Sequence, residues 1–172
     1  MGSPKALLPW RDSTLLDHAL AELRLARVDK VVVVLGPATR HLTLSVQTTF
    51  NPSPESGRST SIRLGAAALP DDVDAVLIQS VDQPTTSDVL TRLFETIALN
   101  TDVAVPTFHG RRGHPVCFAG ALLAELRAVS EQDQGLRALV RRHTVTEVPV
   151  EDESIIWNLN DPAAYAAART KT

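Results

Sequence analysis

Runs of apolar residues of strand length alternate along this chain with stretches in which apolar residues recur at helical spacing. Val31–Leu35 and Asp74–Ile78 are almost uniformly apolar, a pattern typical of strands that are buried on both faces in a parallel sheet. The alternation of such runs with helical stretches predicts an α/β fold whose mostly parallel sheet carries helices on its faces.

Two helix starts are marked by capping residues. Thr14 and Asp17 stand at the spacing of a capping box, ahead of an apolar stripe that includes Leu16, Ala19 and Leu20. Near the end of the chain an aspartate is followed by a proline, which favours an N-cap and a first helical position. Helices are predicted at Ser13–Arg27, Ser87–Ala98, Ala121–Val129, Asp133–Arg142 and Pro162–Arg169.

Shorter strands are predicted in the second half of the chain. Val103–Pro106 and His114–Phe118 have the length and composition of strands, and Val145–Val150 alternates like a half-exposed one. Pro149 favours an edge position for this last strand, because proline cannot donate to a ladder on both sides. Thr43–Ser56 is predicted to form a short strand and a loop. No repeat or linker interrupts the pattern, so we expect a single domain over the whole chain.

Composition limits the classes of function. The 172 residues, 44% of them hydrophobic, suffice for one domain with an ordinary core. A net charge of −3 and scattered Lys and Arg give no basic patch for nucleic acid. No apolar run has the length of a membrane span and no signal layout is present, so we expect a cytoplasmic protein. Cys117 is the only cysteine, which excludes an intrachain disulfide and indicates a small buried hydrophobe.

A polar segment follows the second apolar run, where α/β folds bind their ligands. Open parallel sheets hold ligands beyond the carboxyl ends of their strands, and Asp82 lies shortly after the run that ends at Ile78. Its carboxylate would hold a hard divalent cation against a phosphate. The alternative is a structural aspartate that caps the turn ahead of Pro84.

Three motifs, in this order, resemble one family. Met1-Gly2-Ser3-Pro4-Lys5, Val81-Asp82-Gln83-Pro84 and Asn158-Leu159-Asn160-Asp161-Pro162 resemble the phosphate-binding turn, the metal-binding Asp-x-Pro segment and the closing motif of the MobA-like NTP transferases. Within that family the molybdenum cofactor cytidylyltransferases are the most similar branch. The resemblance implies a Rossmann-like nucleotidyltransferase fold of the nucleotide-diphospho-sugar transferase type, with three layers.

The resemblance covers the chain except at its start. In the family a strand, an alanine- and glycine-rich turn and an arginine come before Met-Gly-x-x-Lys, and here only Met1-Gly2-Ser3-Pro4-Lys5 corresponds. We therefore expect an N-terminally truncated domain that lacks its first strand, and a reading frame that continues upstream of Met1. Residues 1–172 alone are expected to be poorly stable and inactive, because strand edges and phosphate-binding amides would be missing.

The resemblance also implies which residues react. Gly2 and Lys5 would bind the nucleotide phosphates, and Lys5 would stabilise the departing pyrophosphate. Asp82 would hold Mg²⁺ against the α-phosphate, with Asn160 and Asn158 as further ligands. The cytidylyltransferases usually carry aspartates at the last two positions, so the asparagines are a departure. The alternative is that Asn160 helps to cap the last helix and Asn158 lies in a turn.

Asn51, Gly57, Ser61 and Gly65 correspond to the family segment that closes over base and ribose. Gly57 comes before a helix whose N-terminal amides would face the nucleotide. Arg58 stands where the family usually has methionine. The alternative is an ordinary loop rich in serine and glycine that ends at a helix start.

Gly110-Arg111-Arg112-Gly113-His114-Pro115 resembles the acceptor-side motif of the cytidylyltransferases. By this resemblance His114 would bond the acceptor, and Arg111 or Arg112 would pair with its phosphate in bidentate fashion. Arg137 belongs to a further acceptor-side segment. A structural histidine, and an arginine on the wet face of a helix, are the alternatives.

These assignments predict an Mg²⁺-dependent nucleotidyltransferase that moves a nucleoside monophosphate to a phosphorylated acceptor and releases pyrophosphate. CMP from CTP and a molybdopterin-type acceptor are the specific expectation, with molybdoenzyme maturation proteins as further partners and with neither nucleic acid nor membrane. One alternative is a guanylyl- or sugar-phosphate nucleotidyltransferase of the same fold. The other is a degenerate, non-catalytic nucleotide-binding protein.

Overall fold

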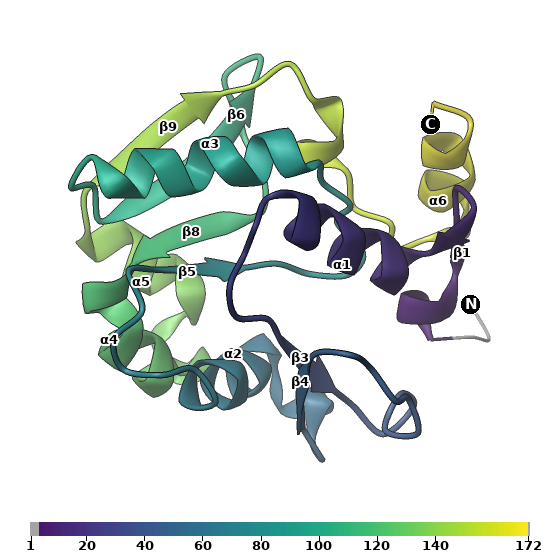
Figure 1. The fold of residues 1–172 in the computed structure, drawn as a ribbon, viewed down its shortest axis with the longest axis horizontal. Helices are drawn as coiled ribbons and strands as arrows, with labels where there is room; N and C mark the ends of the chain where they lie inside the picture. The colour runs from purple at the N-terminus through teal and green to yellow at the C-terminus, as the bar shows by residue number, and fades with distance from the viewer. Residues whose placement is uncertain (1–3, 172) are drawn as a thin grey trace.

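The computed structural model describes residues 4–171, and its main element is a five-stranded sheet. The strand order is β5-β8-β6-β7, and β9 pairs with β6 as well. The chain thus forms the expected α/β fold, with helices packed on the sheet (Figure 1). The strands are β5 (Ala75–Ile78), β6 (Val103–Phe108), β7 (Arg111–Arg112), β8 (Val116–Ala119) and β9 (Val145–Pro149).

The five-stranded sheet is mixed, because β7 and β8 run against the common direction of β5, β6 and β9. β8 runs antiparallel to both β5 and β6, whereas β6 and β9 are parallel. The physical reason is the connection from β6 to β8, which passes through the short strand β7 without a helix. A parallel neighbour requires a long crossover, so such a short return gives antiparallel pairing.

Two further strand pairs lie outside this sheet. β3 (Val32–Leu35) and β4 (Gln47–Phe50) form a parallel pair, and β1 (Pro9–Trp10) and β2 (Ser13–Thr14) form an antiparallel one. β3 is only half-buried except at Leu35, so the expectation of burial on both faces is wrong for it. The reason is that, among the described strands, β3 is bonded to β4 alone.

The predicted helix starts are confirmed by their caps. The Thr14 hydroxyl accepts a hydrogen bond from the Asp17 amide at 3.1 Å, and the Asp161 carboxylate accepts one from the Ala164 amide at 2.8 Å. Among residues 4–171 no helix is long and apolar enough to cross a membrane. The helices are α1 (Leu15–Leu25), α2 (Arg58–Ala67), α3 (Ser87–Ala98), α4 (Leu123–Ala128), α5 (Leu136–Arg142) and α6 (Pro162–Arg169), with short 3-10 turns η1 (Lys5–Leu7), η2 (Pro54–Ser56), η3 (Gly120–Leu122), η4 (Glu131–Asp133) and η5 (Glu153–Ile156).

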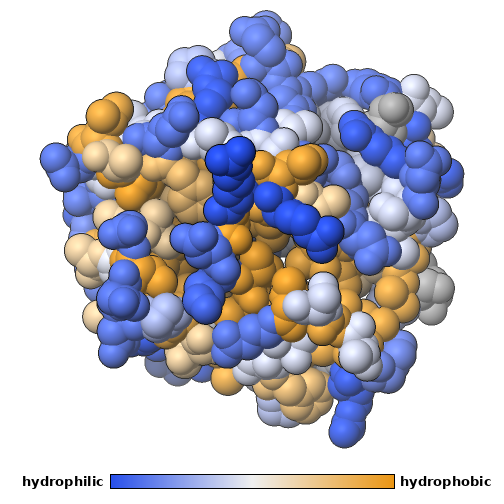
Figure 2. Space-filling model, in the orientation of Figure 1, coloured by the Kyte–Doolittle hydropathy of each residue, from blue (hydrophilic) through white to orange (hydrophobic). Residues whose placement is uncertain are grey.

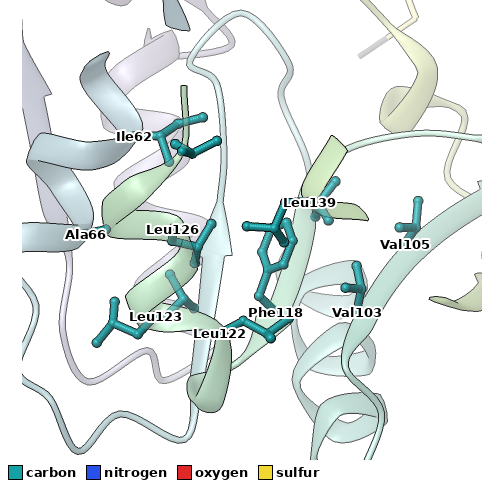
Figure 3. Packing of buried hydrophobic residues seen from close by; sticks show 12 residues of the cluster. Ile62, Ala66, Val103, Val105, Phe118, Leu122, Leu123, Leu126 and Leu139 are labelled. Carbon is teal, nitrogen blue, oxygen red and sulfur yellow. The ribbon is translucent and has the colours of Figure 1, made fainter. Parts of the chain in front are cut away.

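Alternate residues of β8 enter the two halves of the core. Phe118 packs with residues of α2, α4 and α5 on one face of the sheet, as Figure 3 shows. Cys117 packs with α3 on the other face. Burial raises the pKa of the Cys117 thiol to about 12, so it is the inert small hydrophobe expected from its neighbours. The helices therefore form the two outer layers of a three-layer fold.

Candidate functional site

Three predicted site residues meet beyond the carboxyl end of β5. Lys5 Nζ donates to Asp82 Oδ2 at 2.9 Å and also to Asn160 Oδ1. Lys5 is separated in the sequence from Asp82 by 77 positions and from Asn160 by 155 positions. Asn160 Nδ2 in turn donates to Asn158 Oδ1. The tertiary fold thus assembles Lys5, Asp82, Asn158 and Asn160 into one polar cluster.

Leu159 fixes the two asparagines in this cluster. Its side chain is buried against Trp10 and Leu15, and its amide donates to the Asp82 carbonyl at 3.1 Å. Leu159 is buried, whereas Asn158 and Asn160 on either side of it are exposed. The segment is therefore locked to the end of β5 through both its backbone and its apolar residue.

The oxygen atoms of the cluster suit a hard cation. Asp82 supplies a carboxylate and Asn160 a carbonyl, both of which are ligands that Mg²⁺ accepts. An ammonium group, that of Lys5, already lies against both oxygens. No group of three or more His, Cys, Asp or Glu with metal-binding geometry occurs within residues 4–171. A site with few protein ligands fits Mg²⁺, which usually keeps waters and takes substrate phosphates to complete its shell.

Arg58 and His114 lie within electrostatic range of Asp82, and Arg137 lies within range of His114. Burial lowers the pKa of Arg58, the first residue of α2, while Asp82 and Glu131 oppose that shift. Burial likewise lowers the pKa of His114, and Arg58 and Arg137 lower it further, against an opposing effect of Asp82. His114 is therefore neutral at pH 7, and the two arginines supply the positive charge.

His114 is held by its backbone and not by its ring. Its amide donates to the Ile155 carbonyl at 2.8 Å, and the same carbonyl leaves no room for a Cβ at Gly113. The ring Nδ1 is buried and has no hydrogen-bond partner within residues 4–171, and the same holds for both amide atoms of Gln79. Buried polar atoms normally have partners, so these are groups that a bound ligand would satisfy.

Asn51 connects the ends of β3 and β4 to the start of α2. Its amide donates to the Leu35 carbonyl at 2.8 Å, and its side-chain Nδ2 donates to Ser61 Oγ at 2.9 Å. Gly57, directly before α2, has φ +107°, a conformation that favours glycine. Gly65 lies further along α2, where an added Cβ would be 3.2 Å from a methyl of Val34. In this structure Gly65 thus allows close packing of α2 on β3.

Glu131 and Arg58 also lie at this site, although the sequence motifs assign neither of them a role. Glu131 Oε1 accepts a hydrogen bond from the Ser59 amide at 2.6 Å, and this bond lowers the pKa of Glu131. It contacts the first turn of α2 from the turn η4. Arg58 could have been noticed in the sequence, because it stands where the family usually has methionine. The sequence contains no comparable indication for Glu131.

The remaining predicted residues are not joined to the cluster. Arg111 and Arg112 form the exposed strand β7, and Arg112 Nε pairs with Glu147 Oε1 of β9 at 2.8 Å. Gly2 lies outside the described residues. The acceptor-side assignments therefore divide between His114, whose pKa is affected by both Asp82 and Arg137, and the two arginines of the β6–β7 hairpin.

Comparison with known proteins shows matches over most of the chain. The curated bifunctional protein GlmU of Caulobacter vibrioides is 26% identical over 168 residues, which covers 91% of this chain but only 36% of GlmU. The crystal structure of Rv0371c from Mycobacterium tuberculosis H37Rv is 26% identical in sequence and superimposes with a TM-score of 0.84. The match covers 99% of this chain and 90% of the Rv0371c chain. The structure of the same protein in complex with manganese is 24% identical in sequence and has a TM-score of 0.83. The match covers 98% of this chain and 93% of the Rv0371c chain.

The fold is also shared by molybdopterin-guanine dinucleotide biosynthesis protein A from Archaeoglobus fulgidus, which is 17% identical in sequence and has a TM-score of 0.68. The match covers 99% of this chain and 91% of the Archaeoglobus chain. The sequence description of the MobA-like NTP transferase domain matches residues 1–148. With the polar cluster at the carboxyl end of β5, this match establishes that the chain belongs to the MobA-like NTP transferase family.

Proposed function

We propose that this protein transfers CMP from CTP to a molybdopterin-type cofactor and releases pyrophosphate. The observation that carries the transferase proposal is the convergence of Lys5, Asp82 and Asn160 beyond β5. A carboxylate, a carbonyl and an ammonium at one point provide what a triphosphate needs: oxygen ligands for its divalent cation and a positive charge for its oxygens.

The reaction requires positioning and electrostatic stabilisation more than covalent catalysis. A phosphate oxygen of the acceptor attacks the α-phosphorus in line with the departing pyrophosphate. Mg²⁺ bound by Asp82 and Asn160, with Asn158 beside them, would neutralise the charge that develops on the phosphates. Lys5 leaves its ion pair with Asp82 and binds the pyrophosphate oxygens. The manganese complex of Rv0371c supports a divalent metal in this family.

The groups around the cluster divide between the two substrates in this proposal. Asn51 and Ser61, fixed to each other at 2.9 Å, contact ribose or base together with the amides that follow Gly57. Neutral His114 offers its unpartnered Nδ1 to the acceptor, and Arg137 contributes positive charge for the acceptor phosphate.

Gly2, Gly65, Arg111 and Arg112 keep the roles that the family resemblance implies for them, as proposals of the same kind. Gly2 would bind phosphate, Gly65 would line the nucleotide segment, and the two arginines would reach the acceptor from the β6–β7 hairpin. The proposed place of action is the cytoplasm, with molybdoenzyme maturation proteins as recipients of the product.

A substrate panel tests the proposal. Pyrophosphate release is measured with CTP, GTP, ATP and UTP, each with molybdopterin or a sugar phosphate as acceptor, with and without Mg²⁺. We expect release only with Mg²⁺, CTP and molybdopterin together. Release with every acceptor except molybdopterin would contradict the assignment, and nucleotide binding without turnover under all conditions would identify a non-catalytic nucleotide-binding protein.

A guanylyltransferase is the second candidate, and one observation favours it. The site carries asparagines at positions 158 and 160 where the cytidylyltransferases usually carry aspartates, and a molybdopterin-guanine dinucleotide biosynthesis protein shares the fold. A preference for GTP over CTP in the same panel would select this candidate. Transfer to a sugar phosphate is the third outcome that the panel separates.

A further inference from the structure

Arg58 is a cation beside the polar cluster, at the first position of α2. It lines one cavity together with Gln79, Ser80 and Val81, the residues that lead from β5 to Asp82. Most other residues that line this cavity are apolar, and Figure 2 shows hydrophobic residues gathered in the middle of one face of the molecule. Charges beside apolar walls interact more strongly than charges in bulk water. The cation and the end of β5 therefore share one space in which an anion would be attracted.

The guanidinium of Arg58 has no hydrogen bond or salt bridge within residues 4–171. Partial removal from water lowers its pKa, whereas Asp82 and Glu131 oppose that shift, so both carboxylates are close enough to attract it. Each of them is bonded elsewhere, Asp82 to Lys5 and Glu131 to the Ser59 amide. Arginine keeps its charge in proteins and carries five donors. The guanidinium is therefore available to an anion that comes from outside the chain.

Two neighbours of Arg58 carry polar atoms without partners. Both amide atoms of Gln79, and Nδ1 of His114, are buried and have no hydrogen-bond partner within the described part of the chain. Gln79 lines the same cavity as Arg58, and the charge of Arg58 contributes to the lowered pKa of His114. Guanidinium, amide and imidazole groups can all donate hydrogen bonds to a phosphate oxygen. The surroundings of Arg58 thus suit a phosphate group.

Glu131 supplies an anion of the chain itself at the start of α2. Its Oε1 accepts a hydrogen bond from the Ser59 amide at 2.6 Å, although the two residues are 72 positions apart. Two glycines make room for it: a Cβ on Gly57 would overlap Cγ of Glu131, and one on Gly135 would lie 3.3 Å from Oε2. Amides at a helix N-terminus attract phosphates as well as carboxylates. The Glu131 carboxylate therefore satisfies an environment that also suits a phosphate.

We propose that Arg58 is a phosphate-binding residue of this protein and that the Glu131 carboxylate holds the place of the phosphate in the substrate-free form. This role rests on the proposed function, in which the phosphate belongs either to the nucleotide or to the acceptor. When the phosphate binds, its oxygens accept hydrogen bonds from the Arg58 guanidinium, and Glu131 releases the Ser59 amide. Methionine, the usual residue of the family at position 58, has no donor for such a bond.

Titration with inorganic phosphate, followed by phosphorus NMR, tests this role without nucleotide and without turnover. The variants are Arg58→Met, Glu131→Gln and the two changes combined. Arg58→Met introduces the residue that the family usually has, and Glu131→Gln removes the charge but keeps an oxygen for the Ser59 amide. Arg24→Met and Glu151→Gln, which change the charge in the same way at exposed positions, are the matched controls.

We expect Arg58→Met to weaken phosphate binding by about tenfold or more, because charge-assisted hydrogen bonds are lost. Glu131→Gln should strengthen it by about threefold or more, because a competing anion is removed. In the combined variant the gain from Glu131→Gln should be smaller than in the parent chain, since the two side chains act on one phosphate. Affinities of Arg58→Met and Glu131→Gln equal to those of their controls would overturn the proposal.

Competition identifies the source of the phosphate. CTP with Mg²⁺, or molybdopterin, is added to protein that has bound inorganic phosphate. Displacement by CTP assigns Arg58 to the nucleotide, and displacement by molybdopterin assigns it to the acceptor. Displacement by neither would overturn its assignment to a substrate. Pyrophosphate release tests the proposed function separately: turnover of Arg58→Met equal to that of the parent chain would contradict this role of Arg58 and leave the transferase proposal intact.

Discussion

At the scale of single residues, Asp82 takes part in three electrostatic interactions of the site. Its carboxylate accepts a hydrogen bond from Lys5 and attracts Arg58 at the start of α2. The same carboxylate opposes the lowering of the His114 pKa. A change at this position therefore affects the proposed metal, nucleotide and acceptor contacts together.

Asp82→Asn is expected to lower pyrophosphate release by about 10²-fold or more in protein that turns over, because an anionic metal ligand is lost. The measurement is turnover at saturating Mg²⁺ and nucleotide. Asp88→Asn, at an exposed position in the first turn of α3, is the matched control and should leave turnover unchanged. Turnover of Asp82→Asn equal to that of this control would move the metal site elsewhere.

Asn160→Ala is expected to reduce the same turnover by less than Asp82→Asn, since a neutral carbonyl ligand is lost and the carboxylate remains. The apparent Mg²⁺ affinity, measured by titration of activity, should weaken. A result in which thermal stability falls while the Mg²⁺ titration is unchanged would identify Asn160 as a structural residue near the N-terminus of α6.

At the scale of elements, β8 determines how the core divides. Phe118 and Cys117 point to opposite faces of the sheet, and both are fully buried. The antiparallel insertion of β8 between β5 and β6 places Phe118 in one hydrophobic cluster with residues of α2, α4 and α5. One side chain of β8 therefore belongs to a core cluster to which three helices contribute.

Phe118→Ala should lower the free energy of unfolding by about 3–5 kcal/mol, because it removes a large buried ring and leaves a cavity. Urea unfolding followed by circular dichroism measures the change. Leu99→Ala, at a position 82% exposed at the end of α3, serves as control and should change stability by about 0.5 kcal/mol or less. Similar losses in both variants would show that Phe118 is not a core residue.

At the scale of the whole molecule, the buried His18 and the half-buried His114 make stability depend on pH. Burial lowers the pKa of His18, against an opposing effect of Glu22, and burial with Arg58 and Arg137 lowers that of His114. The unfolded chain, with histidine pKa values near 6.5, binds more protons than the folded chain in mildly acidic solution. The free energy of unfolding should therefore be intact above about pH 6.5 and fall as pH decreases below it.

We expect Tm to decline between pH 7.5 and pH 5.5, and His18→Gln to make that decline shallower. Thermal unfolding in a series of buffers of equal ionic strength measures both slopes. His41→Gln, at an exposed position, is the control and should keep the slope of the parent chain. An unchanged slope in His18→Gln would show that His18 titrates alike in the folded and unfolded states.

The sequence by itself determined the helices and helix caps that depend on residues a few positions apart. The helix α3 has the predicted bounds Ser87–Ala98, and the caps at Thr14 and Asp161 form as their spacing indicated. Cys117 is buried as its neighbours suggested. Capping and hydrophobic period depend on residues a few positions apart, so a sequence specifies them without knowledge of the fold.

Only the tertiary structure decided which distant residues meet. The sequence placed Asp82 after a strand, but the contacts of Lys5 with Asp82 and Asn160 cross 77 and 155 residues and depend on how Leu159 packs. The antiparallel course of β8 and the contact of Glu131 with α2 are equally non-local. Strand order and partner choice are set by the packing of the whole chain, because the same apolar run can pair with any edge that is open to it.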